Sequence, residues 1–169
     1  MVDLGIGGAI RIREGDDGPY FVMWPISAMH GQADSGMYFR VAIEESPGGW
    51  RAFVPARSNW SVEAPARDDA KEKLASLIVD ALRHEEELIA RYIEADPRRP
   101  GEGNARLKDT GPSVWVIIGY LEGAHGDVRQ TADDYDLAPV AVEAARAYYL
   151  QHRAVIDARR AANRVPRVA

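Results

Sequence analysis

The residues that most often carry catalysis are scattered along this chain. The four histidines, His30, His84, His125 and His152, form none of the spacings typical of a metal-binding helix, such as HxxxH or HExxH. The chain has no cysteine, which excludes a thiolate nucleophile and a cysteine-ligated zinc ion. The glycines of the segment 5–8 precede a predicted strand rather than a helix, which argues against a dinucleotide-binding loop. We therefore expect no catalytic residue, no metal ion and no cofactor.

One group of carboxylates falls on strands that we expect to be neighbours. Glu44, Glu45 and Glu63 have the chemistry of a general acid–base pair. Arg40 and Arg51 lie on the same strands, and surface ion pairs between arginine and glutamate are the simpler interpretation. The pattern predicts a protein that is not an enzyme.

Positive charge gathers only at the C-terminal end of the chain. Residues 151–169 carry five arginines and one aspartate, whereas the whole chain has a net charge of −5. A charge run of this kind is commonly a solvated helix end. The alternative is a protein-binding surface, in which an apolar anchor at helical spacing is flanked by arginines that pair with carboxylates. The residues of this predicted partner-binding surface are Tyr149, His152, Arg153, Ile156, Arg159 and Arg160.

An antiparallel β-meander is predicted for the first part of the chain. Each expected strand alternates apolar and polar residues or is rich in aromatic and β-branched residues, and turn-forming Gly, Pro and Asp residues separate the strands. The expected strands are Ala9–Arg13, Tyr20–Trp24, Tyr38–Glu45, Trp50–Val54 and Trp60–Glu63. In the third of them, Phe39, Val41 and Ile43 share one face, which we expect to be buried.

The clearest helix covers Pro65–Glu94, where apolar residues recur with helical spacing from Leu74 to Ile93. About 30 helical residues span ~45 Å, more than a small sheet needs. We therefore expect the end of this helix to reach another element or a partner chain. Residues 96–111 are rich in Pro, Gly and charge and predict a linker. The expected domains are 1–95 and 112–169.

The second domain has the order short helix, tight turn, longer helix. Asp127 is a suitable N-cap for Val128–Tyr135, and Pro139 is placed to begin Val140–Arg153, which can continue to Asn163. This order predicts a small all-α helix-turn-helix domain, although plain helical hairpins share it. The fold class is α+β, a sheet with one long helix followed by this domain.

Only a few basic or amide side chains of this domain could donate hydrogen bonds to DNA. Residues 127–150 carry two basic and five acidic side chains, so attraction to phosphate is weak and only a dimer should bind well. The alternative is a dimerisation module that makes no groove contact. The candidate DNA-binding residues are Arg106, Lys108, Arg129, Gln130 and Arg146.

Residues 104–163 resemble a bacterial helix-turn-helix antitoxin family of the VapB type. The resemblance is carried by Pro112-x-Val114-Trp115-x-Ile117, by Asp133-x-Tyr135-x-Leu137-x-Pro139, by Val142-x-x-Ala145-x-x-Tyr148-Tyr149 and by His152-x-x-x-Ile156. Residues 38–93 are similar to HicB-like domains in the order of three strands and a helix that opens on Asp68-Asp69-Ala70. HicB-like domains are also antitoxin components.

The resemblance implies the antitoxin of a type II toxin–antitoxin module. Such a protein neutralises a small, PIN-like nuclease toxin by contact and represses its own operon through the helix-turn-helix. The implied partners are the cognate toxin, operator DNA and further copies of the chain in a homodimer or higher oligomer. The alternative is a stand-alone DNA-binding transcriptional regulator whose N-terminal domain dimerises or senses a ligand.

The composition favours a cytoplasmic protein that does not interact with membranes. No apolar run approaches the ~20 residues of a membrane span. The segment Met1–Leu4 lacks the basic start of a secretory signal, and the absence of cysteine fits a reducing compartment.

Overall fold

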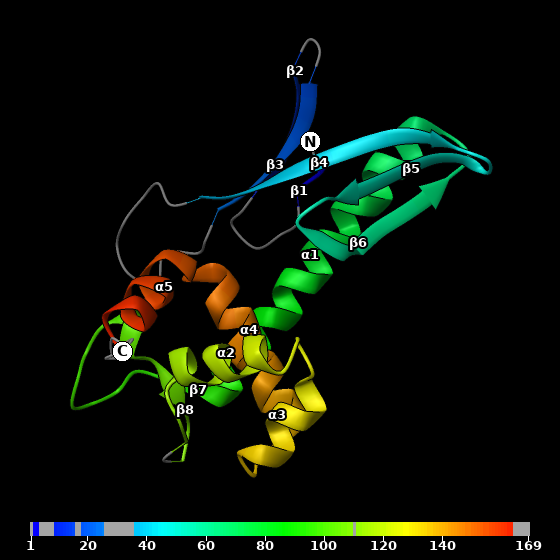
Figure 1. Ribbon diagram of the computed structural model, residues 1–169. Helices are drawn as coiled ribbons and strands as arrows, with labels where there is room; N and C mark the ends of the chain where they lie inside the picture. The colour runs from blue at the N-terminus through cyan, green and yellow to red at the C-terminus, as the bar shows by residue number, and fades with distance from the viewer. Residues whose placement is uncertain (1, 4–8, 16–17, 26–35, 110, 164–169) are drawn as a thin grey trace. The chain divides into compact units, whose positions relative to one another are not determined.

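The chain is a mixed α+β protein in which an antiparallel sheet is followed by helices. The computed structural model describes residues 2–3, 9–15, 18–25, 36–109 and 111–163 (Figure 1). The contacts divide the chain into two compact units, Met1–Ala81 and Leu82–Ala169. The division falls inside the long helix, whereas the sequence predicts a domain boundary after it.

Within the described residues, six strands form the sheet of the first unit, and strands adjacent in sequence are antiparallel neighbours in the sheet. The strands are β1 Val2–Asp3, β2 Ala9–Gly15, β3 Gly18–Pro25, β4 Gly36–Ser46, β5 Gly49–Val54 and β6 Arg57–Ala64. The predicted hairpin of β2 and β3 is confirmed by the pairing of Ile12 with Val22. The sharp β4–β5 turn requires Gly49, whose φ is 130° and where a Cβ atom would lie 2.5 Å from the carbonyl oxygen of Ala64.

One face of strands β4–β6 is buried, as the alternation in sequence predicts. Phe39 and Val41 of β4 are buried, and the ring of Phe39 packs edge-on against Trp60 of β6 with centroids 5.1 Å apart. Helix α1, Arg67–Tyr92, buries Leu74 and Ile78. Because these two residues are one helical turn apart, they place a single apolar stripe in the core of the first unit.

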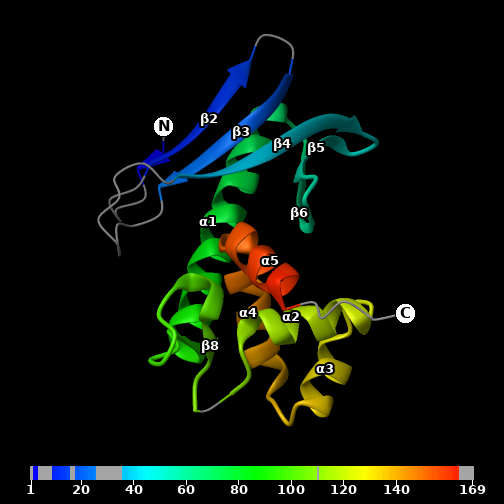
Figure 2. The ribbon, with the colours of Figure 1, turned by 60° about the vertical axis from the view of Figure 1, so that its left-hand side comes forward.

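The described part of the second unit is helical apart from one short β-ladder. Its elements are β7 Ile93–Glu94, the 3-10 helix η1 Glu102–Asn104, β8 Arg106–Leu107, α2 Val114–Gly123, α3 Val128–Asp134, α4 Pro139–Gln151 and α5 Arg153–Ala162 (Figure 2). Its core includes Ile117 of α2, Val142 of α4 and Ile156 of α5, all completely buried. Leu88, Ile89 and Tyr92 at the end of α1 pack against this core, so the end of the long helix reaches another element as expected.

Residues 96–111 are not a linker. Ala105 and Leu107 are buried in the core of the second unit, and β8 pairs with β7. Backbone hydrogen bonds join Leu107 to Pro112 at 3.0 Å and Val114 to Ala105 at 2.9 Å. The Pro, Gly and charged residues around them gave this segment a polar average, which hid two strongly buried positions.

No helix in the described part of the chain is long and apolar enough to cross a membrane.

Candidate functional site

The α3–α4 pair is built around a short turn with satisfied backbone groups. The carboxylate of Asp127 accepts a hydrogen bond from the backbone N–H of Gln130 at 2.9 Å and so caps α3, as predicted. The N–H of Leu137 donates to the carbonyl oxygen of Ala132 at 2.8 Å, and Pro139 occupies the start of α4. Asp136 adopts a φ of 52°, a left-handed conformation that tight turns commonly use.

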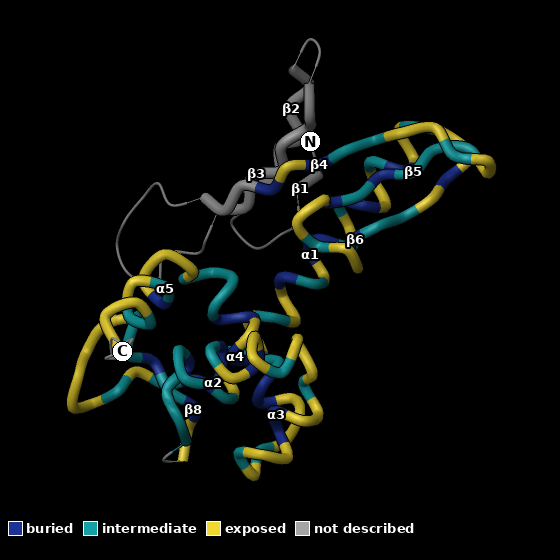
Figure 3. The backbone as a smooth tube through the Cα atoms, in the orientation of Figure 1, coloured by how far each residue is buried: buried dark blue, intermediate teal, exposed yellow. Residues whose placement is uncertain are grey.

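The residues that carry the antitoxin resemblance largely form the interior of this unit. Val114, Ile117, Val142, Ala145, Tyr148 and Ile156 are all buried. Figure 3 shows buried stretches along α2, α3 and α4. Tyr135 of the turn packs edge-on against Tyr120 of α2, with ring centroids 5.2 Å apart. The motif is therefore explained by packing, and it leaves the chemistry of the surface to other residues.

Two of the five candidate DNA-binding residues are exposed on α3, and one lies on α4. Arg129 and Gln130 are exposed. Arg146 is half-exposed and forms an ion pair with Glu143 at 2.6 Å, so contact with a phosphate would compete with a neighbouring carboxylate.

The other two candidates make contacts away from α3 and α4. Arg106 of β8 pairs with Glu94 of β7 at 2.6 Å. The Nζ atom of Lys108 donates to the carbonyl oxygen of Ala90 near the end of α1 at 2.6 Å. Arg106 therefore fastens the segment 96–111 to β7 and Lys108 fastens it to the end of α1, which is a structural role for both side chains.

The surface of α3 and the turn is acidic. Asp133, Asp134 and Asp136 are exposed there, and the hydroxyl of Tyr120 donates to Asp134 at 2.5 Å. This hydrogen bond raises the pKa of the exposed Tyr120 above its usual value, with further contributions from burial and the negative charge of Asp134. Because carboxylates repel phosphate, this surface is unfavourable for non-specific DNA binding.

The expected apolar anchor of the C-terminal region faces its own unit. Ile156 is completely buried in the core, which excludes it from a partner-binding surface while α5 stays docked. Tyr149 packs against the same core, and its hydroxyl donates to Asp157 at 3.2 Å. The expected helical stripe is present, but it packs inward against the core.

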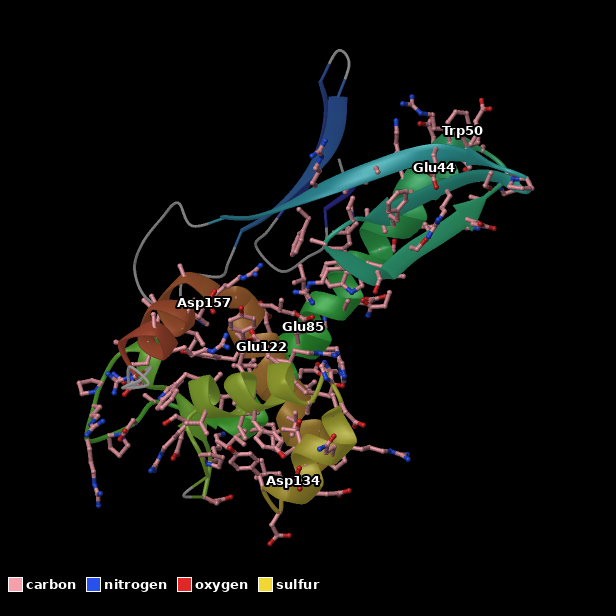
Figure 4. All side chains as sticks on the ribbon, in the orientation of Figure 1. Glu44, Trp50, Glu85, Glu122, Asp134 and Asp157 are labelled. Atoms are coloured by element: carbon pink, nitrogen blue, oxygen red, sulfur yellow. The ribbon has the colours of Figure 1, made fainter. Side chains whose placement is uncertain are left out.

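Arg160 is held by carboxylates from two helices. Its guanidinium contacts both carboxylate oxygens of Glu122 on α2 and lies 3.3 Å from Asp157 on α5. Figure 4 labels these two acidic residues. The side chain of Arg160 is only 14% exposed, and the hydrogen bonds that it donates to Glu122 raise its pKa above the usual value for arginine. We call this trio the α5 lock.

Of the remaining tail arginines, Arg153 is the most accessible in the described structure. Its side chain is 71% exposed, and its Nε lies 3.6 Å from Asp157. Arg159 is partly buried, and its Nε atom makes no hydrogen bond. Arg164 and Arg167 lie outside the described residues.

His152 occupies the corner between α4 and α5, where the sequence predicted a continuous helix. Its φ of −119° and ψ of 31° break the helix. Its ring stacks on Tyr148 with centroids 4.2 Å apart, and its Nδ1 atom lies 3.2 Å from the carboxylate of Glu102 in η1. Tyr148 donates from its hydroxyl to the carbonyl oxygen of Glu102 at 3.1 Å.

Of the three glutamates expected on the sheet, Glu44 forms an ion pair with an arginine. Glu44 lies 3.5 Å from Arg51, which is its cross-strand neighbour and also faces Glu63. The described residues contain no group of three or more His, Asp or Glu side chains that could hold a metal ion.

Two residues escaped the sequence analysis, Glu102 and Glu122. Glu102 pairs with His152 at the corner between α4 and α5. Glu122 pairs with Arg160 of α5, which lies 38 residues away in the sequence. Asp157 lies three residues before Arg160 and four after Arg153, so helical spacing alone would have found that partner.

Comparisons with family models, with curated proteins and with solved structures give no match to this chain.

Proposed function

We propose that this protein is the antitoxin of a type II toxin–antitoxin module, which neutralises a small nuclease by direct contact. The observation that carries the proposal is the agreement between the resemblance motif and the α3–α4 pair. Tyr135, Leu137 and Pro139 of the motif are the residues that make the turn between these helices. This local agreement supports a helix-turn-helix formed by α3 and α4.

Protein contact fits the described surface better than DNA contact does. The α3 surface is acidic, whereas Arg153 presents an exposed guanidinium next to the ring of Tyr149, 5.9 Å from its centroid. Exposed arginine beside an aromatic ring is common at protein interfaces. A PIN-like nuclease would offer clustered metal-binding carboxylates, for which arginine is a suitable partner.

The test is co-production of the full chain with the nuclease encoded beside its gene. We expect the chain to restore growth and to co-purify with the nuclease. The charge reversal Arg153→Glu should weaken co-purification at least ten-fold, because a carboxylate would replace the arginine at the contact. Lys73→Glu on the exposed surface of α1 is the matched control and should leave binding unchanged.

Growth that stays arrested when the full chain is produced in soluble form would overturn the antitoxin proposal. Binding that survives Arg153→Glu would instead move the contact to another surface. If the chain shifts its own promoter DNA without protecting growth, the stand-alone transcriptional regulator is the better description.

Repression of the operon is the second part of the proposal, with Arg129 and Arg146 as the phosphate-contacting side chains. Replacing both by alanine should lower promoter affinity and flatten its dependence on salt, because each lost phosphate contact reduces the slope by about 1. Promoter affinity that is unchanged in this double variant would exclude α3 and α4 from the DNA contact.

A further inference from the structure

The corner between α4 and α5 is joined to η1 by side chains that meet at one residue. Glu102 receives the hydroxyl hydrogen bond of Tyr148 on its backbone carbonyl and the contact of His152 on its carboxylate. The His152 ring is inclined by 27° to the ring of Tyr148, so the two rings stack. The carboxylate of Glu102 and the imidazole of His152 are 50% and 25% exposed, which leaves both open to protons from solvent.

Histidine is the side chain whose charge ordinarily changes near neutral pH. A neutral imidazole offers Glu102 at most a hydrogen bond, whereas an imidazolium adds a full opposite charge at the same distance. We propose that His152 and Glu102 form a pH-sensitive clamp, in which protonation of His152 tightens η1 against the α4–α5 corner and so holds α5 in place. The clamp does not depend on the proposed function.

The other charged groups around the clamp do not cancel the attraction between protonated His152 and Glu102. From η1 the facing group is Glu102, and from α4 it is Tyr148, whose pKa is raised to about 12 by burial and by Glu102, so that it stays neutral near pH 7. From α5 the charged groups that follow His152 first in the sequence are Arg153 and Asp157, which pair with each other. Arg159 adds a further positive charge on α5, and Glu102 is the only carboxylate in contact with His152 in the described structure.

The reporter is the backbone amide of Ile156, which donates to the carbonyl oxygen of His152 at 3.1 Å and so responds to opening of the corner. Its hydrogen-exchange protection, corrected for intrinsic rates, is measured on the full chain at about pH 5.5 and about pH 8, where carboxylates with ordinary pKa values stay ionised. We expect protection to be roughly two- to five-fold higher at the lower pH, the range of a partly exposed ion pair.

Two variants remove the clamp from opposite sides. Both His152→Gln and Glu102→Gln should abolish the pH difference, and Glu102→Gln keeps the corner histidine if His152→Gln fails to fold. His84→Gln, an exposed histidine on α1, is the matched control and should retain the difference. Equal protection at both pH values in the unmodified chain, or a difference that persists in both clamp variants, would overturn the proposal.

Discussion

At the scale of the residue, the environment of Arg160 decides its role more than its charge does. The guanidinium is largely shielded from water and faces two oxygens of Glu122, a bidentate geometry that suits arginine better than lysine. Asp157 supports the same group from one helical turn away. The α5 lock therefore joins α2 to α5 across a long stretch of sequence.

A double-mutant cycle measures this lock. Arg160→Ala and Glu122→Gln, singly and together, should show a coupling free energy of about 1 kcal/mol in chemical denaturation of the full chain, since Glu122 is partly exposed. The exposed pair Arg146–Glu143, three residues apart on α4, is the comparison and should give only ~0.2–0.5 kcal/mol. Equal coupling in the two cycles would mean that burial adds nothing to the lock.

Ionisation of Tyr148 should lower the stability of the folded chain at alkaline pH. Burial, together with the nearby Glu102, raises its pKa in the folded chain to about 12, from about 10 when unfolded. The unfolded chain therefore loses this proton first, so the stabilisation is complete below about pH 10 and is lost as the pH rises towards about 12.

The measurement is the pH dependence of unfolding for Tyr148→Phe. This variant should lose ~0.5–1.5 kcal/mol near neutral pH, because its hydroxyl no longer bonds to Glu102, but should show a smaller further loss at alkaline pH. Tyr92→Phe is the matched control and should keep the alkaline loss of the unmodified chain. An unchanged alkaline loss in Tyr148→Phe would assign it to another group.

The sequence predicted the contacts of a residue well where its partner lies only a few positions away. The Asp127 cap and the alternating faces of β4 follow from spacing of a few residues. The contacts of Arg160 with Glu122 and of His152 with Glu102 join residues 38 and 50 positions apart, and local spacing carries no information about such pairs.

At the scale of the element, α2 contains a glycine that the packing does not require. A Cβ atom at Gly119 would meet only the Nε atom of Arg160, at 3.8 Å, which is an ordinary contact. Gly119→Ala should therefore raise the free energy of unfolding by ~0.5–1 kcal/mol, because alanine has the higher helix propensity, and chemical denaturation measures this gain.

Gly49→Ala is the opposite case and should lower the free energy of unfolding. Its φ of 130° is unfavourable for alanine, and the new Cβ atom would lie 2.5 Å from the carbonyl oxygen of Ala64.

Helix α5 is an integral element of the second unit. Ile156→Ala should cost ~2–5 kcal/mol of stability, since the side chain is completely buried, whereas Val155→Ala at a 40% exposed position should cost less than ~0.5 kcal/mol. A small loss for Ile156→Ala in denaturation would mean that α5 is only loosely docked. For the same reason, truncation after Gln151 would damage the fold and could not by itself locate a partner-binding surface.

The main elements were predictable from the periodicity of apolar residues. The structure of the segment 96–111 and the helix break at His152 were not. Helix α1 and strands β2–β6 follow their hydrophobic patterns closely. The segment 96–111 was misread because its two buried residues are too few to set a pattern, and the break at His152 was missed because its neighbours favour helix on both sides.

At the scale of the whole molecule, the apolar stripe of α1 does not argue for an oligomer. Leu74, Ile78 and Leu82 are almost completely buried within the chain itself, so they offer no face to a second copy. Self-association remains a prediction that rests on the two-fold symmetry of helix-turn-helix binding sites. We expect light scattering at micromolar concentrations to give more than the mass of one chain, and a monomer would contradict this prediction.

The inward-facing motif of the α3–α4 unit also bears on how such chains diverge. Substitution of a buried motif residue such as Val142 or Ala145 would cost stability directly, so selection for folding alone keeps these positions. Arg129, Gln130 and Arg153 are exposed and can vary at little cost to the fold. Two descendants of one ancestor can therefore retain the same motif while exchanging their partners, and the motif traces ancestry more faithfully than it traces specificity.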